Sequence, residues 1–300
     1  MKATYREDFL KAGALAGQVR AYGKSLIQVG ASYNAVIQAV RKKIEELGAI
    51  PAFPPQIALN DVAAHYLPQP GQDIIFSNEI IKLDVGICYN GAIGDCAVTV
   101  DLSGKYQNII DAAEASLLAA EQTVKVGVPI REIGKVIEDT ITSFGLSPVR
   151  NLCGHGLGFF KVHTPPLIPN YHDNSKGVIQ PGMTIAIEPF ATNGKGMIHE
   201  EGEPTLFSII SSRSPRTEMG HQVLSKIQSF KALPFCLHDI VDEHMPLMLA
   251  KQGVHDLLQA GALIGYPPLV EKAHGMVAQA ENSILIDKQG KVFVTTRLPS

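Results

Sequence analysis

Two stretches within the first 150 residues follow the same pattern, and this duplication limits the fold more than any other feature of the sequence. Each stretch contains a helix with periodic apolar residues, a Val-Gly pair, a second amphipathic helix and a glycine stop. The glycines are Gly30 and Gly48 in the first copy and Gly127 and Gly145 in the second, so the copies are 97 residues apart. The pattern predicts two helix-helix-strand units related by a pseudo-twofold axis, with a cleft between them.

The β-type sequence lies around these helices. Segments 80–85 and 93–100 flank Asn90-Gly91, a dipeptide typical of a two-residue hairpin turn. Further strands are expected at 183–190, from 277 onward, at 283–286 and at 292–296. Between them, residues from about 203 to about 265 have helical periodicity. We therefore expect one α+β catalytic domain, residues 1–300, that contains a helical insertion subdomain at about 203–265.

An aspartate lies in the middle of each arm of the predicted hairpin. Asp84 and Asp95 interrupt otherwise apolar segments, where a buried carboxylate is costly unless a cation or strong donors compensate it. If the turn centres on Asn90-Gly91, the two aspartates are diagonal neighbours, and if it centres one residue earlier they are directly opposite. Both registers put them on one face, where two like charges favour a cation between them. The alternative is a hairpin whose charges face water.

Two further apolar segments each contain one glutamate, Glu188 and Glu281. Under the duplication, these segments correspond to the two arms of the aspartate hairpin, opened by the insertion. Four carboxylates would then meet at the axis, and two divalent cations would neutralise them. His155, between two glycines, offers a fifth ligand, and an oxygen-rich site with one imidazole suits Mn²⁺, Fe²⁺, Co²⁺ or Zn²⁺. A pair of such metals indicates hydrolysis by an activated water.

Three histidines are candidates for moving protons or stabilising an oxyanion beside such a site: His65, His163 and His199. His65 and His163 are 98 residues apart, close to the offset of the repeat, so we expect them to face each other across the axis. Each of the three could also be a routine packing or surface histidine.

The five acidic and histidine residues, in this order and in these contexts, resemble the metal-ligand set of methionine aminopeptidases. Segments 63–66, 187–196 and 266–269, together with the insertion, look like the type II branch, and the lack of a long N-terminal extension is similar to its archaeal form. The resemblance implies the pita-bread fold, with pseudo-twofold repeats around a central antiparallel sheet. It also implies removal of the N-terminal methionine from nascent proteins and peptides, with a small second residue preferred. Type II members usually carry histidine after the last glutamate, whereas this chain has Asn282, which on a strand would point away from Glu281.

The resemblance also implies a role for each ligand. Asp84 would bind one metal through both oxygens, Asp95 and Glu281 would bridge the two metals, and His155 and Glu188 would complete the second.

The remaining implied roles concern the substrate. Glu188 would shuttle the proton of the attacking water, His65 would contact the leaving amide nitrogen, and His163 would contact the scissile carbonyl oxygen. Phe53 and His199 would line the pocket for the methionine side chain.

Other readings of the sequence stay open. A prolidase or Xaa-Pro aminopeptidase shares this fold and these ligands, and a non-enzymatic pita-bread protein could bind protein or RNA. The net charge of -3 gives no reason to expect nucleic acid or a membrane as partner. The four cysteines show no CxxC spacing and the N-terminus has no apolar signal core, so we expect a cytoplasmic protein. We also expect it to be a monomer. With nascent chains as substrate, association with the ribosome is a further expectation.

Overall fold

The computed structural model describes residues 3–298, and its two helix pairs follow the predicted repeat. The helices are α1 (Ala3–Leu26), α2 (Tyr33–Glu46), α3 (Gln107–Thr123) and α4 (Ile130–Ser143). Gly30 and Gly127 both have φ near +85°, which glycine adopts without steric cost. Their N–H groups donate to the carbonyls of Phe76 and Ile179, so each helix pair is joined to its half by the same contact.

The first half forms a small antiparallel sheet. Its strands are β1 (Ile50–Pro51), β2 (Gln56–Leu59), β4 (Ile80–Tyr89) and β5 (Ala92–Asp101). The order is β1-β4-β2, with β5 also paired to β4. β3 (Val62–Ala64) instead pairs with β15 (Leu269–Glu271), which also pairs with β11 (Ile198–Glu200) in a separate sheet of order β11-β15-β3. The β4–β5 turn centres on Asn90-Gly91, so Asp84 is opposite Ala97 and diagonal to Asp95. The register that the sequence left open is thereby settled.

The second half holds most of the remaining strands. They are β6 (Ser147–Pro148), β7 (Cys153–Gly158), β8 (Lys161–Pro169), β9 (Thr184–Ile187), β10 (Phe190–Thr192), β11 (Ile198–Glu200), β15 (Leu269–Glu271), β16 (Val277–Gln279), β17 (Asn282–Ile286) and β18 (Val292–Val294). The main sheet has the order β18-β17-β9-β7-β8, and β10 pairs with β16 and β6. The single strand predicted at 183–190 is wrong: it breaks at Glu188-Pro189, because proline has no N–H for a ladder.

The two halves meet along a seam between β5 and the segment 279–283. The Ser283 hydroxyl accepts from Asp95 N at 2.8 Å and donates to Asp95 O at 2.9 Å. The Thr99 hydroxyl does the same with Gln279, donating to its carbonyl at 2.7 Å and accepting from its N–H at 2.9 Å. Two hydroxyl bridges thus hold the strand of Asp95 beside the segment that carries Glu281.

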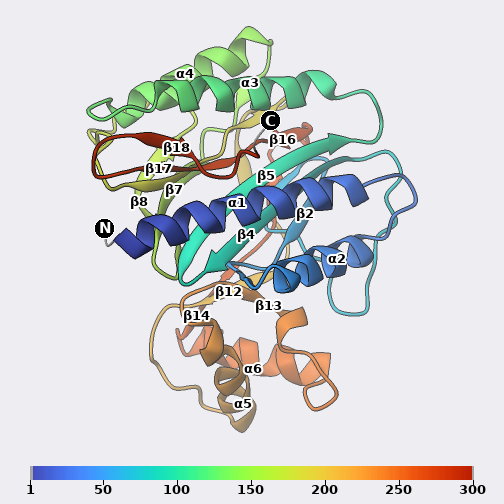
Figure 1. The fold of residues 1–300 in the computed structure, drawn as a ribbon. Coiled ribbons are helices and arrows are strands. Elements are labelled where there is room, and N and C mark those ends of the chain that lie inside the picture. The colour runs from blue at the N-terminus through green and yellow to red at the C-terminus, as the bar shows by residue number, and fades with distance from the viewer. Residues whose placement is uncertain (1–2, 299–300) are drawn as a thin grey trace.

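The segment predicted as a helical insertion is only partly helical. It contains β12 (Leu206–Ile209), α5 (Glu218–Ile227), η1 (Gln228–Phe230), β13 (Phe235–Cys236), η2 (Leu237–Asp239), α6 (Leu247–Gln259) and β14 (Leu263–Tyr266). A three-stranded sheet of order β13-β12-β14 accompanies the helices, and the group lies at the bottom of Figure 1. It has its own apolar cluster, which includes Phe207, Val223 and Leu257. Its assignment as a subdomain of a single catalytic domain stays a prediction.

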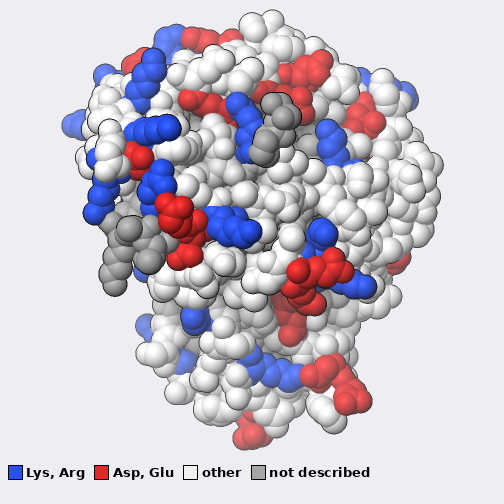
Figure 2. Space-filling model, viewed as in Figure 1, with Lys and Arg blue, Asp and Glu red and all other residues white. Residues whose placement is uncertain are grey.

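Charges on the visible surface are mixed. On the face in Figure 2, Lys and Arg side chains lie among Asp and Glu side chains, with wide uncharged areas between them. Among residues 3–298, none of the helices combines the length and the apolar character required to cross a membrane.

Candidate metal centre

The five predicted ligands line one cavity of about 240 Å³. Asp84 and Asp95 come from β4 and β5, and His155 from β7. Glu188 and Glu281 occupy the breaks between β9 and β10 and between β16 and β17. The sheet of each half therefore supplies part of the set, and the seam brings the parts together.

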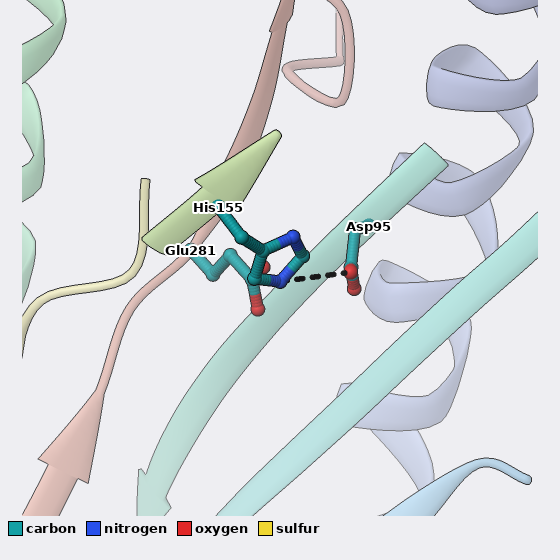
Figure 3. A group of neighbouring side chains, drawn as sticks. All are labelled: Asp95, His155 and Glu281. Atoms are coloured by element: carbon teal, nitrogen blue, oxygen red, sulfur yellow. Dashed lines mark ion pairs between the residues drawn. The ribbon is translucent and has the colours of Figure 1, made fainter. Parts of the chain in front are cut away.

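His155 lies among the carboxylates. Its Nε2 is 3.4 Å from Glu188 Oε1 and 3.8 Å from Asp95 Oδ2. One potential ligand atom from each of Asp95, His155 and Glu281 lies within 4.8 Å of the others, and Figure 3 shows these side chains turned toward one another. This spacing fits side chains that share a cation.

Among the described residues, no Lys or Arg forms an ion pair with the four carboxylates, and only His155 lies at ion-pair distance from any of them. Burial raises the pKa of Asp84 to about 7. Burial, followed by repulsion from neighbouring carboxylates, raises the pKa values of Asp95, Glu188 and Glu281 well above their usual range. One oxygen each of Asp84, Asp95 and Glu281 is buried without a hydrogen-bond partner among the described residues. Orphaned anionic oxygens around one imidazole are the donor set expected for divalent cations, so the residues fit a metal centre.

The imidazole is kept neutral. Burial, followed by the nearby His163, lowers the pKa of His155 to about 3. Its Nδ1 lies 3.2 Å from the Gly156 carbonyl, a contact that places the ring proton on Nδ1. The lone pair of Nε2 then faces the carboxylates, as metal ligation requires.

Three of the four other predicted site residues line the same cavity: Phe53, His65 and His163. The ring centroids of His155 and His163 are 4.4 Å apart. Burial lowers the pKa of His163, while burial followed by His163 lowers that of His65 to about 4. Both imidazoles are therefore neutral near pH 7.

Phe53 fits because the neighbouring strand has a glycine. A Cβ at Gly86 would come within 2.3 Å of Phe53 Cε1, so only glycine leaves room for this ring against β4. The apolar wall of the cavity thus depends on a residue that has no side chain.

His199 is the exception among the predicted site residues. It is absent from the cavity's lining, its side chain is 39% exposed, and its Nε2 lies 3.1 Å from Glu201 Oε2. The geometry gives no support to its predicted place in a methionine pocket. The position of His199 depends on the pairing of its strand, β11, with β15, which carries none of the predicted ligands. A single sequence does not show this pairing.

Several lining residues escaped the sequence analysis. Leu206, Pro234 and Tyr266 reach the cavity from the insertion, so this segment forms part of its wall. Gln56 also lines the cavity and lies opposite Asp84 in the β2–β4 ladder. Gln279 is not a lining residue, but its Nε2 is 3.3 Å from Glu281 Oε2. A polar residue in a short apolar strand was the available signal for each glutamine.

Asn282, which follows the last predicted ligand, points away from the four ligand carboxylates as predicted. Its Nδ2 donates to Glu121 Oε1 at 2.7 Å, and its Oδ1 accepts from Arg20 at 2.9 Å and from Thr296 at 2.7 Å. Arg20 also donates to the carbonyl of Glu281 at 2.6 Å, so this network fixes the backbone behind Glu281.

Comparison with known proteins agrees with this geometry. Residues 7–222 match the model of metallopeptidase family M24. A methionine aminopeptidase of Archaeoglobus fulgidus is 37% identical over 292 residues, which cover 97% of this chain and 98% of the relative. Among solved structures, a methionine aminopeptidase from Thermotoga maritima has a TM-score of 0.71 at 21% identity and covers 99% of this chain and 98% of its own. A thermophilic Arx1 has a TM-score of 0.86 at 16% identity, with 100% and 92% covered. These two structures share the fold, and it is the sequence relative that bears on chemistry.

Proposed function

The chain belongs to metallopeptidase family M24, and from this premise we propose that it is an aminopeptidase that removes the N-terminal methionine from proteins and peptides. The observation that carries the proposal is the convergence of four buried carboxylates and the neutral His155 in one cavity. The archaeal relative that matches almost the whole chain is named for the same activity.

The centre is proposed to hold two divalent ions, Co²⁺, Mn²⁺, Fe²⁺ or Zn²⁺, on Asp84, Asp95, His155, Glu188 and Glu281. Four ionised carboxylates would carry a charge of about −4, which two divalent ions balance and one does not, and this favours a pair. When bound, such ions act as Lewis acids, which make water acidic enough to react near neutral pH and stabilise negative charge on a carbonyl oxygen.

The side chains around the centre divide the remaining work. Glu188, a buried carboxylate with a raised pKa, takes a proton from the attacking water and passes it to the departing amine. Neutral His163 donates a hydrogen bond to the scissile carbonyl oxygen, where charge develops in the transition state. Neutral His65 contacts the leaving amide nitrogen.

The rest of the cavity favours a chain end with an apolar first side chain. Phe53, Phe190, Leu206 and Leu269 supply its apolar wall. Its volume of about 240 Å³ lies below the usual range of about 300–1,000 Å³ for small-molecule sites, so it admits only a short end of the chain. We propose that the second residue is small. Since newly made chains begin with methionine, we place the protein in the cytoplasm, as a monomer that acts on chains leaving the ribosome.

Turnover of two peptides tests the function. The metal-loaded protein should release methionine from Met-Ala-Ser and leave an Xaa-Pro peptide intact, and metal analysis should find two equivalents per chain. Preferred cleavage of the Xaa-Pro peptide would instead assign a prolidase-type activity. Bound metal without cleavage of either peptide would favour a non-enzymatic binding protein.

A further inference from the structure

The backbone of His65 is held in an unusual conformation. Its φ is +61°, in the left-handed region, which costs a residue other than glycine about 1–2 kcal/mol. Such strain persists only where the surroundings enforce it, and it gathers at functional sites. The structure shows two contacts that enforce it. His65 N donates to Gln56 Oε1 at 2.6 Å, and Thr205 Oγ1 donates to His65 O at 2.6 Å.

Gln56 has a second contact at the other end of its carboxamide. The residue is 4% exposed and lies on β2, directly opposite Asp84 on β4. Its Nε2 is 3.5 Å from Asp84 Oδ2. One side chain therefore touches both a predicted metal ligand and the backbone of the histidine that faces the same cavity.

The chemistry of the carboxamide suits this double contact. An amide side chain accepts through its oxygen and donates through its nitrogen. A glutamate at position 56 could still accept from His65 N, but it would put another anionic oxygen beside Asp84. A leucine of similar size could do neither, and would leave the part-buried N–H of His65 without this partner.

From these contacts we propose that Gln56 is a positioning residue that couples His65 to Asp84. This inference rests on the proposed function, since it takes His65 to act on the substrate. Through the amide oxygen, Gln56 fixes the left-handed backbone that aims the His65 ring into the cavity. Through the amide nitrogen, it orients one oxygen of Asp84. Thr205, at the start of the insertion, holds the other side of His65 and forms no hydrogen bond with Asp84 within residues 3–298.

Three variants separate the two contacts. Gln56→Leu removes both, Gln56→Glu keeps the acceptor for His65 N, and Thr205→Val removes only the hydroxyl that binds His65 O. Each is loaded with Zn²⁺. The measurements are kcat and KM on Met-Ala-Ser, Zn²⁺ affinity by calorimetry, and the backbone amide spectrum of protein labelled with ¹⁵N-histidine, which contains ten histidines.

Gln56→Leu should lower kcat by about 10- to 100-fold, because a small misplacement of a reacting group has that effect. It should also weaken Zn²⁺ binding and shift the His65 amide signal upfield as the short hydrogen bond is lost. Gln56→Glu should keep the wild-type His65 amide shift while Zn²⁺ affinity changes. Thr205→Val should lower kcat with Zn²⁺ affinity unchanged.

Two results would overturn the proposal. One is a wild-type His65 amide shift and kcat in Gln56→Leu. The other is a loss of kcat in that variant that excess Zn²⁺ restores in full, since Gln56 would then act on the metal alone. If Gln56→Leu does not fold, the smaller substitution Gln56→Ala, which also removes the acceptor for His65 N, decides the His65 contact by the same amide shift. Failure of the wild-type protein to cleave Met-Ala-Ser would contradict the proposed function instead, and the spectra and calorimetry would still report on Gln56.

Discussion

The first half of the molecule carries its two acidic residues on one unbroken hairpin, whereas the second half carries them where strands are interrupted. Asp84 and Asp95 lie inside β4 and β5, each ten residues long and joined by a two-residue turn. Glu188 and Glu281 lie between short strands, and the whole insertion separates them in the chain. Two copies of one unit have thus kept the same site through different local structure.

The difference shows what must replace a tight turn when a hairpin is opened. In the second half, β10 pairs with β16 in the register Phe190 to Gln279, so the two arms are still adjacent. Glu271 then fastens the chain after β10 to the chain before β16. It is fully buried and accepts N–H bonds from Lys195, Ala273 and Gly275. We call the second half, whose hairpin is interrupted by the insertion, the open half, and the first half the closed half. A buried carboxylate thereby joins the two arms of the open half, as the Asn90-Gly91 turn joins the two arms of the closed half.

The strongest test of the comparison is to remove one seam carboxylate from each half. Asp95→Ala and Glu281→Ala should each lower turnover by about 10³-fold or more, because metal stabilisation of transition-state charge contributes several kcal/mol. Both should also lose bound metal, measured by elemental analysis of purified protein. Exposed Glu203, outside the cavity, provides a control substitution to Ala. Near-normal turnover in either ligand variant would contradict the proposal that both halves supply essential metal ligands.

The histidines of the second half should differ from one another although their rings are only 4.4 Å apart. His163→Ala should lower kcat by about 10²–10³-fold, the usual effect of losing one donor to an oxyanion. Bound metal should stay near the wild-type level, because we assign His163 to the substrate. His155→Ala should lose metal. Equal loss of metal and rate in His163→Ala would make His163 a ligand and contradict its assigned role.

Sequence patterns predicted the closed half more completely than the open half. The dipeptide Asn90-Gly91 predicted the hairpin, although not its register, and the aspartates in its apolar strands indicated a metal centre. In the open half, the break at Pro189 was missed because apolar periodicity continues through it. The strands of the insertion were missed because short apolar runs do not distinguish strand from helix. The contacts of Gln56 depend on long-range register, which single-sequence patterns do not contain.

A milder change tests Glu271, the clamp that joins the two arms of the open half in place of a turn. Glu271→Gln should lower the free energy of unfolding at pH 7 by about 2 kcal/mol, since bonds to a charged acceptor contribute about 1.5–3 kcal/mol each and the amide keeps one acceptor oxygen. Although burial opposes it, N–H donors from Ala273, Gly275 and Lys195 hold the pKa of Glu271 below its usual 4.5. Stability from a lowered carboxyl pKa is present above the unfolded value and is lost as pH falls through the folded value.

The gap between wild-type and Glu271→Gln protein should therefore narrow below about pH 4.5. Denaturant titrations of both proteins at pH 7 and pH 4 measure it. A gap that is absent at pH 7, or that widens in acid, would show that Glu271 does not act as the clamp.

The smallest expected effect concerns the turn that closes the first half. Gly91 has φ +86°, and a Cβ there would lie 2.3 Å from Phe159 Cε2. Gly91→Ala should cost about 1–2 kcal/mol of unfolding free energy, partly from the left-handed backbone and partly from moving the ring of Phe159 and that of Phe160, whose Cε2 lies 2.7 Å from the added Cβ. Gly104 is a matched control, because its φ is +70° and no atom lies within 4 Å of the added Cβ. Gly104→Ala should show the backbone cost alone, so the difference in thermal unfolding between the two variants measures the contacts with Phe159 and Phe160. Turnover should be retained in Gly91→Ala, since β4 and β5 stay paired along ten residues and keep both aspartates in register. Loss of bound metal in Gly91→Ala, but not in Gly104→Ala, would mean that the turn and not the ladder sets the position of the aspartates.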